Sequence, residues 1–243
     1  MPFTEADMYQ PVKKYLESLG YTVTAEVKGA DVTAFGAGEL VILELKRNFN
    51  VKLLFQALDR QQTADKAYIV LPRPKKHNSR QFKHIRHIAA SLGLGLMTVA
   101  MDSAVKTVEV HADPRPADGA ATPSKRGAAV KRSMLLEIAG RSMDLNTGGS
   151  AGTKQLTAYR EKCIQIACAL YDNGPSSAKD LIDKRGCEKD ARAVMYANHY
   201  GWFKRLNKGV YALSDAGVEA IEHGSDFKEI IDYYRSGENQ TFK

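Results

Sequence analysis

The sequence predicts an α/β domain followed by a smaller, mainly α domain, and three observations indicate this. Apolar patterning over residues 4–71 follows the order α-β-β-β-α-β. The step from the third strand through a helix to the fourth is a crossover, which makes these strands parallel and gives a mixed sheet with helices on both faces. From residue 112 the chain becomes rich in proline, glycine and small polar residues, and helical patterns prevail after that segment.

The first helix is expected over residues 4–19, because Met8, Val12, Leu16 and Leu19 recur at helical spacing and Gly20 is a natural stop. Three strands should follow at 21–27, 31–36 and 40–46. The later elements of this domain are expected to be a helix at 51–64, a strand at 67–71, a helix at 82–92, a strand at 94–99 and a last strand near 105–111.

Length and composition indicate two domains in a soluble protein. A chain of 243 residues with 44% hydrophobic content exceeds the usual size of one domain. We expect the domains at 1–111 and 155–243, joined by a linker at 112–154 that contains a short helix at 128–141. No apolar run is long enough for a membrane span and the N-terminus does not read as a signal peptide, so a cytoplasmic location without membrane contact is expected. Cys163, Cys168 and Cys187 are read as reduced core thiols.

The second domain should contain three helices and a hairpin. The helices fit residues 155–172, 176–183 and 188–200, the hairpin arms 202–206 and 210–213, and a further helix should begin near Leu213. This order resembles a winged helix-turn-helix domain, which implies DNA contacts through the third helix and the hairpin. The basic residues expected to make these contacts are Lys189, Arg192, Lys204, Arg205 and Lys208. A protein-binding role stays open, because residues 155–243 carry 13 basic and 13 acidic side chains.

Two carboxylates and one ammonium fall on adjacent strand-like segments of the first domain. Glu44 and Lys46 are two apart on one expected strand, so they should share a face. The turn 36–38 can fold the preceding strand back antiparallel, which brings Asp31 within reach of Glu44. Two close carboxylates repel, and a hard divalent cation between them is the commonest solution.

The same tripeptide pattern occurs a second time, at Glu26-Val27-Lys28. This copy has Lys13 rather than an acid 13 residues upstream, so it is read as a surface ion pair. For Glu44 and Lys46 a surface ion pair is the competing interpretation.

Asp31, followed 13 residues later by Glu44-Leu45-Lys46, resembles the signature of the PD-(D/E)XK phosphodiesterase superfamily. The resemblance covers residues 4–111, with weaker similarity to the end, and departs from the pattern at Ala30, where proline is usual. It implies a restriction-endonuclease-like core and hydrolysis of phosphodiester bonds with Mg²⁺ or Mn²⁺ held by Asp31, Glu44 and the Leu45 carbonyl. Lys46 would orient the attacking water and neutralise charge on phosphorus.

Other candidate residues surround this motif. A family glutamate maps best onto Glu5, with Glu17 second, although a charge at a helix N-terminus would explain Glu5 equally well. Gln56 and Arg60 share one helix face and could grip a phosphate or the lysine, unless that face is simply solvated.

A basic stretch runs from Arg73 to Arg86 and predicts polyanion binding, with a solvated basic face as the alternative. The nucleic-acid contacts expected there are Lys75, Lys76, Arg80 and Lys83. A zinc site at His77, His84 and His87 is disfavoured, because only His84 and His87 have helical spacing and no cysteine is near.

The sequence therefore predicts a magnesium-dependent endonuclease that docks on duplex DNA, and leaves a homodimer open. Two alternatives remain: a DNA-binding or regulatory scaffold without turnover, and an enzyme that acts on RNA or a nucleotide derivative.

Overall fold

A computed structural model describes residues 3–115, 125–150 and 153–236 of the chain. The chain divides into two compact units. The first comprises residues 1–139 and 144–155, and the second comprises residues 140–143 and 156–243.

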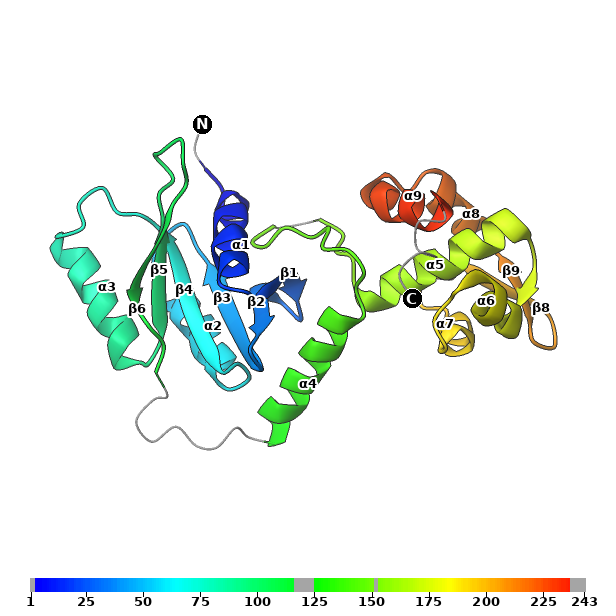
Figure 1. The fold of residues 1–243 in the computed structure, drawn as a ribbon, viewed down its shortest axis with the longest axis horizontal. Helices are drawn as coiled ribbons and strands as arrows, with labels where there is room; N and C mark the ends of the chain where they lie inside the picture. Colours follow the sequence, from blue (N-terminus) through cyan, green and yellow to red (C-terminus); the bar gives the residue numbers. More distant parts are fainter. Residues whose placement is uncertain (1–2, 116–124, 151–152, 237–243) are drawn as a thin grey trace. The chain divides into compact units, whose positions relative to one another are not determined.

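The first unit is built on a six-stranded mixed sheet in the order β1-β2-β3-β4-β5-β6 (Figure 1). β1, β2 and β3 form an antiparallel meander, β3, β4 and β5 are parallel, and β6 is antiparallel to β5. The strands are β1 (Thr22–Val27), β2 (Ala30–Gly36), β3 (Glu39–Leu45), β4 (Lys66–Pro72), β5 (Gly95–Val99) and β6 (Val108–Ala112). The predicted α-β-β-β-α-β order and the mixed sheet are confirmed.

Helices cover both faces of this sheet. α1 packs on one face against alternate residues such as Val32 and Leu43, while α2 and α3 pack on the other face against Ile69 and Leu96 (Figure 1). The helical elements here are η1 (Ala6–Met8), α1 (Tyr9–Ser18), α2 (Val51–Gln61) and α3 (Arg80–Ser91). Successive side chains along each strand point to opposite faces of the sheet, so the apolar core under α1 is separated from the core under α2 and α3.

Local capping sets where these helices begin. Thr4 donates its backbone N–H to Asp7 Oδ2 at 2.7 Å, which supports Thr4 as the start of the first helical segment. Asn50 Oδ1 accepts the backbone N–H of Leu53 at 2.9 Å and Ser79 Oγ accepts that of Phe82 at 3.3 Å, so α2 and α3 both have an N-cap side chain. Apolar spacing in the sequence predicts α2 and α3, and these caps fix their first residues.

Much of the segment expected to be a linker packs on the first unit. α4 (Lys125–Ala139) buries Met134 against Val27, Ala30 and Ile42. The described residues 144–150 and 153–155, which we call the anchored segment, also belong to this unit. The proline-rich part of the expected linker at 116–124 lies outside the described residues.

The second unit combines helices with a small antiparallel sheet in the order β7-β9-β8. Its helices are α5 (Ala158–Asn173), α6 (Ala178–Arg185), α7 (Ala191–Ala197), α8 (Asp215–Glu222), η2 (Ser225–Phe227) and α9 (Lys228–Ser236), and its strands are β7 (Ser176–Ser177), β8 (Phe203–Asn207) and β9 (Val210–Leu213). The hairpin and the three helices before it lie where the sequence predicts them, and α9 was not foreseen. The winged-helix assignment stays a prediction.

The three cysteines are free and buried, as expected for core thiols. Burial raises the pKa of the Cys163 thiol to about 11 and that of Cys168 to about 12, so both are protonated at neutral pH. In the part of the chain that the structure describes, no helix has the length and apolar character needed to cross a membrane.

Candidate active site

The β2–β3 hairpin brings Asp31 and Glu44 opposite each other. The two strands pair from Gly36 with Glu39 to Val32 with Leu43, and the next pair in this register is Asp31 with Glu44. Ala37 and Gly38 form the turn and both have positive φ, at 51° and 81°, as a two-residue hairpin loop requires. The local sequence therefore places the two carboxylates at the same end of the hairpin.

Lys46 lies at the end of β3 and contacts both Asp31 and Glu5. Its Nζ is 3.6 Å from Asp31 Oδ2 and donates to Glu5 Oε2 at 3.0 Å and to the Leu45 carbonyl oxygen at 2.9 Å. Asp31 Oδ2 also accepts the backbone N–H of Leu45 at 2.8 Å. The structure thus brings together the three motif residues and Glu5.

Glu5 lies at the start of the first helical segment but makes no side-chain cap there. Its second oxygen, Oε1, accepts the backbone N–H of Arg47 at 3.3 Å, so Glu5 spans two consecutive residues of the motif strand. Glu17, the weaker candidate, lies at the other end of α1 and is 3.9 Å from Lys13. Glu5 is therefore the helix glutamate that reaches this site.

Arg60 on α2 is an ion-pair partner of Glu44. Arg60 Nε donates to Glu44 Oε1 at 2.6 Å, and its Nη2 donates to the carbonyl oxygen of Gly29. The side chain of Arg60 is largely buried, so a solvated helix face does not describe it. Sequence spacing identified the correct face of α2, whereas the carboxylate partner of Arg60 was not foreseen.

Two buried oxygens in this region have no hydrogen-bond donor among the described residues: Glu44 Oε2 and Gln56 Oε1. Each buried acceptor without a donor costs about 1 to 3 kcal/mol. A cation or a proton placed at Glu44 Oε2 would remove that cost. The structure therefore leaves one carboxylate oxygen of Glu44 available for an additional positive group.

Glu44 has an unusual electrostatic environment. Burial, and next the negative charge of Asp31, raise the pKa of Glu44 to about 7, although Arg60 and Lys46 act in the opposite direction. Burial alone would lower the pKa of Lys46, but the charges of Asp31 and Glu5 raise it. Carboxylates with a raised pKa beside a cationic side chain are typical of functional sites.

Glu26 is a fourth acid at this site, and its interpretation as a surface side chain is wrong. In the β1–β2 register, Ala25 pairs with Val32 and Val27 with Ala30, which puts Glu26 opposite Asp31. Glu26 is 7% exposed, and burial followed by the charge of Asp31 raises its pKa. The hairpin register was the signal that could have revealed it.

The anchored segment lies against these acids. Glu26 Oε1 accepts the backbone N–H of Gly149 at 3.0 Å, and Glu26 Oε2 accepts from Gln155 Nε2 at 2.9 Å. A Cβ at Gly148 would overlap the Asp31 carbonyl oxygen, and one at Gly149 would lie 3.0 Å from the Cβ of Glu5. Close approach of this backbone to the site thus requires glycine at both positions.

Asp144 fixes the start of the anchored segment. Its Oδ2 accepts from Tyr9 Oη at 2.6 Å and from Lys13 Nζ at 2.5 Å, and its Oδ1 accepts the backbone N–H of Ala25 at 3.2 Å. These partners come from α1 and β1, more than 100 residues away in sequence. No local pattern could have predicted this contact.

Three oxygen atoms at this site could hold a metal ion. The orphaned Glu44 Oε2, the second oxygen of Asp31 and the Leu45 carbonyl oxygen form the kind of oxygen donor set that Mg²⁺ and Mn²⁺ prefer. No group of three or more His, Cys, Asp or Glu side chains that could hold a metal ion is found among the described residues. The residues thus fit a site with two carboxylates and one main-chain carbonyl.

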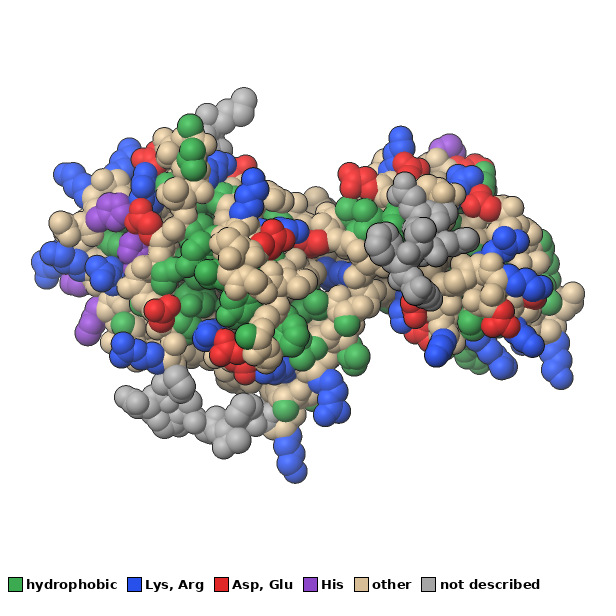
Figure 2. All heavy atoms as spheres, viewed as in Figure 1, with side chains coloured by type: hydrophobic (Ala, Val, Ile, Leu, Met, Phe, Trp, Pro, Cys, Tyr) green, Lys and Arg blue, Asp and Glu red, His purple; other side chains and the backbone are tan. Residues whose placement is uncertain are grey.

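The expected basic contacts of the first unit are exposed. Lys75 and Lys76 precede α3, and Arg80 and Lys83 lie on it, all open to solvent. Figure 2 shows basic and histidine side chains gathered over this end of the unit. Arg73 is instead paired with Asp102 at 3.0 Å and Glu109 at 3.4 Å.

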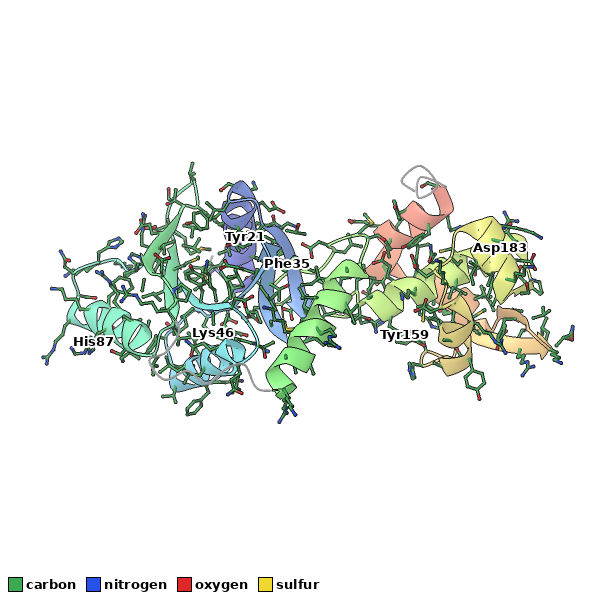
Figure 3. The ribbon with its side chains drawn as sticks, turned by 60° about the horizontal axis from the view of Figure 1, so that its bottom comes forward. Tyr21, Phe35, Lys46, His87, Tyr159 and Asp183 are labelled. Atoms are coloured by element: carbon green, nitrogen blue, oxygen red, sulfur yellow. The ribbon has the colours of Figure 1, made fainter. Side chains whose placement is uncertain are left out.

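Two histidines of this region make contacts with aromatic rings or a polar side chain. His77 lies against Phe82 and His111, and the His111 ring nitrogen Nε2 is 2.7 Å from Thr98 Oγ1. His87 lies on α3, on a different element from Lys46 (Figure 3). These contacts give the histidines structural partners, and the expectation that they do not form a zinc site stays a prediction.

The basic candidates of the second unit lie near its hairpin. Lys189 precedes α7 and Arg192 lies on it. Arg205 lies on β8, and Lys208 lies in the turn between β8 and β9. These four line one groove. Lys204 is exposed on β8 but does not line that groove.

Comparison with known families gave one match. Residues 97–220 match the family model described as putative PD-(D/E)XK phosphodiesterase (DUF2161). This stretch runs from β5 into α8, so Asp31, Glu44 and Lys46 lie before it. Comparisons with curated proteins and with solved structures found no match.

Proposed function

We propose that this chain, which belongs to the PD-(D/E)XK phosphodiesterase family that its central residues match, is a metal-dependent nuclease that hydrolyses DNA. The observation that carries the proposal is the hairpin register that sets Asp31 opposite Glu44, with Lys46 Nζ 3.6 Å from Asp31. Placing like charges together is costly, and such an arrangement favours a site that binds a cation and a phosphate.

Asp31, Glu44 and the Leu45 carbonyl would hold Mg²⁺ or Mn²⁺. When bound, the ion supplies polarisation of a phosphate oxygen and makes a water molecule a stronger nucleophile. Arg60 fixes Glu44 through Oε1, which leaves Oε2 as the acceptor that this role needs. Arg60 therefore acts as a positioning residue.

Lys46 would contact the substrate directly. Two of its three N–H groups are used by Glu5 and the Leu45 carbonyl, which leaves one to donate to a water or a phosphate oxygen. A fixed ammonium next to a phosphate stabilises charge that develops there during hydrolysis. Glu5 holds Lys46 in this position, whether or not it also contributes to metal binding.

DNA is the proposed substrate because exposed cations are available to bind a long polyanion. Lys75, Lys76, Arg80 and Lys83 are open to solvent on and before α3. Contacts of this type position nucleic acid without reading its sequence. RNA and nucleotide derivatives are the competing substrates, and the assay below includes them.

A scaffold without turnover is the second candidate, and one observation favours it. Glu44 is already paired with Arg60 at 2.6 Å, so part of its negative charge is neutralised by the protein itself. In that case the same residues would stabilise the fold, and the chain would bind DNA without cutting it.

Incubation of the purified chain with plasmid, linear, branched and single-stranded DNA and with RNA, in Mg²⁺, Mn²⁺ or EDTA, tests the activity. We expect cleavage of DNA with either metal and none in EDTA. Intact nucleic acid under every condition would support the scaffold.

A melting experiment tests the metal site without a substrate. Saturating Mn²⁺ should stabilise the wild-type chain by on the order of 2 kcal/mol when its concentration is far above the dissociation constant. Asp31→Asn should be at least as stable as wild type in EDTA and should lose most of the metal effect. If Asp31→Asn destabilised the chain in EDTA and still responded to metal, Asp31 would be a structural residue.

A further inference from the structure

The second unit contains an open groove of about 640 Å³ between α6, α7 and the β8–β9 hairpin. Five cationic side chains line it, and Asp183 on α6 is its one acidic lining residue among those described (Figure 3). The five cations are Lys179, Lys189, Arg192, Arg205 and Lys208. Sequence patterning had identified four of them and had missed Lys179.

These five cations have no carboxylate partner among the described residues. Other cations of the same unit do pair, including Lys162 with Asp190 at 2.6 Å and Lys184 with Asp180 at 2.6 Å. The segment 155–243 as a whole has 13 basic and 13 acidic residues. Its positive charge is therefore concentrated at the groove, although the net charge is zero.

An aromatic side chain and an apolar floor accompany the charges. Tyr196 is 81% exposed and lies four residues after Arg192, so both project from the same face of α7. Ala178, Ile182 and Tyr211 form the apolar part of the lining. An exposed tyrosine has no packing reason to be there, and beside a basic groove its ring can lie against a sugar of a nucleic-acid backbone.

We propose that this groove binds the phosphate backbone of duplex DNA. The cations come from α6, α7 and the hairpin, so they flank the groove on several sides rather than converging on one point. A single phosphate would need convergent donors, whereas a row of phosphates needs positive charge spread along a surface. This groove would be where the nuclease proposed above holds its substrate, and binding there can be measured without cleavage.

The test uses the full chain carrying Lys46→Ala, which prevents cleavage from obscuring binding. Binding of a short labelled duplex is measured by fluorescence anisotropy in EDTA over a series of salt concentrations. The groove variant adds Lys189→Ala, Arg192→Ala and Lys208→Ala. The matched control adds Lys184→Ala, Arg185→Ala and Lys228→Ala, which remove the same charge from exposed positions outside the groove.

We expect the groove variant to lower the slope of log affinity against log salt by roughly 2 to 3 units, since each phosphate contact contributes about 0.9. The control should keep the wild-type slope. Tyr196→Ala should weaken binding by up to roughly tenfold without changing the slope, because an uncharged ring contact is lost, and Tyr196→Phe should bind like wild type. Thermal melts of each variant verify that the second unit is folded.

Two outcomes would overturn the inference. Equal slopes for the groove variant and the control would place the DNA contacts elsewhere, for example at α3. No duplex binding at about 50 mM salt by any folded variant would favour an acidic protein segment as the occupant of the groove. Because cleavage is assayed separately, a chain that binds through the groove but never cuts would refute only the nuclease proposal.

Discussion

The two Glu-x-Lys tripeptides of the first unit, Glu26-Val27-Lys28 and Glu44-Leu45-Lys46, have similar glutamates but very different lysines. Both glutamates are buried next to Asp31, and burial raises the pKa of each. Lys28 lies in the two-residue turn between β1 and β2, with φ of 51°, and is exposed. Lys46 instead continues the sheet, because its backbone N–H donates to the Val70 carbonyl oxygen at 3.1 Å.

This difference shows that position on the hairpin, rather than the tripeptide, decides whether the lysine lies beside the buried acids. A turn residue points into solvent, where an ammonium is well hydrated and contributes little. A residue that follows the strand end beside a parallel neighbour stays within reach of the acids on adjacent strands. Only the second copy therefore supplies a cation to the site.

The largest expected difference between the copies concerns their lysines. Lys46→Ala should slow DNA cleavage by about 10²- to 10³-fold, because a fixed charge that stabilises the transition state is removed. Lys28→Ala should cleave at the wild-type rate. Single-turnover cleavage at saturating enzyme measures both rates, and a comparable loss in the two variants would contradict the assignment of Lys46.

A second difference concerns the pH dependence of stability in EDTA. Because folding raises the pKa of Glu44 from 4.5 to about 7, the folded chain keeps a proton that the unfolded chain releases. The stabilisation is complete below pH 4.5 and is lost as the pH rises to 7, to an extent of about 3 kcal/mol.

Urea unfolding between these pH values, compared for wild type, Glu44→Gln and Glu26→Gln, measures that loss. Glu44→Gln should remove most of the dependence. Glu26→Gln should remove a smaller part with the same sign, because its pKa is also raised but backbone N–H groups from Gly149 and Ser150 lower it. A wild-type stability that increases over this range would contradict the sign.

The smallest expected effect is on catalysis by the Glu26 variant. Glu26→Gln keeps a hydrogen-bond acceptor for Gly149 but weakens its hold on the anchored segment, which touches Glu5 and Asp31. A loss of one such interaction, about 1 kcal/mol, corresponds to a cleavage rate roughly fivefold lower. A rate as low as that of Lys46→Ala would instead make Glu26 part of the catalytic group.

Local signals explain which parts of the fold could be predicted. The hairpin with Asp31 and Glu44 follows from strand alternation and one glycine turn, and α2 and α3 follow from apolar spacing. Residues 144–150 and 153–155 could not be placed, because the small, polar composition of this stretch predicts flexibility. Asp144 and Gln155 hold them to the first unit through partners that are distant in sequence.

In the candidate site, too, contacts between elements could not be predicted from local signals. Helical spacing grouped Gln56 with Arg60 but could not show that Arg60 pairs with Glu44, since that contact depends on how α2 packs on β3. Glu26 was misjudged for a different reason. Its position opposite Asp31 depends on the register of the first hairpin, whereas the tripeptide and its upstream spacing report only on the second.

The β2–β3 turn makes the interval of 13 residues between Asp31 and Glu44 a matter of chain length. In this hairpin the residue numbers of every pair add up to the same value, so the length of the turn decides which residue lies opposite Asp31. If the two-residue turn is kept, inserting one residue beside Ala37 or Gly38 would pair Asp31 with a side chain of the opposite face. Insertion of a single alanine there should therefore abolish activity even though every acid and the lysine are retained. Deletions and insertions are normally best tolerated at exposed turns. At this turn, however, the number of residues matters as much as their identity, because it decides which side chains face each other.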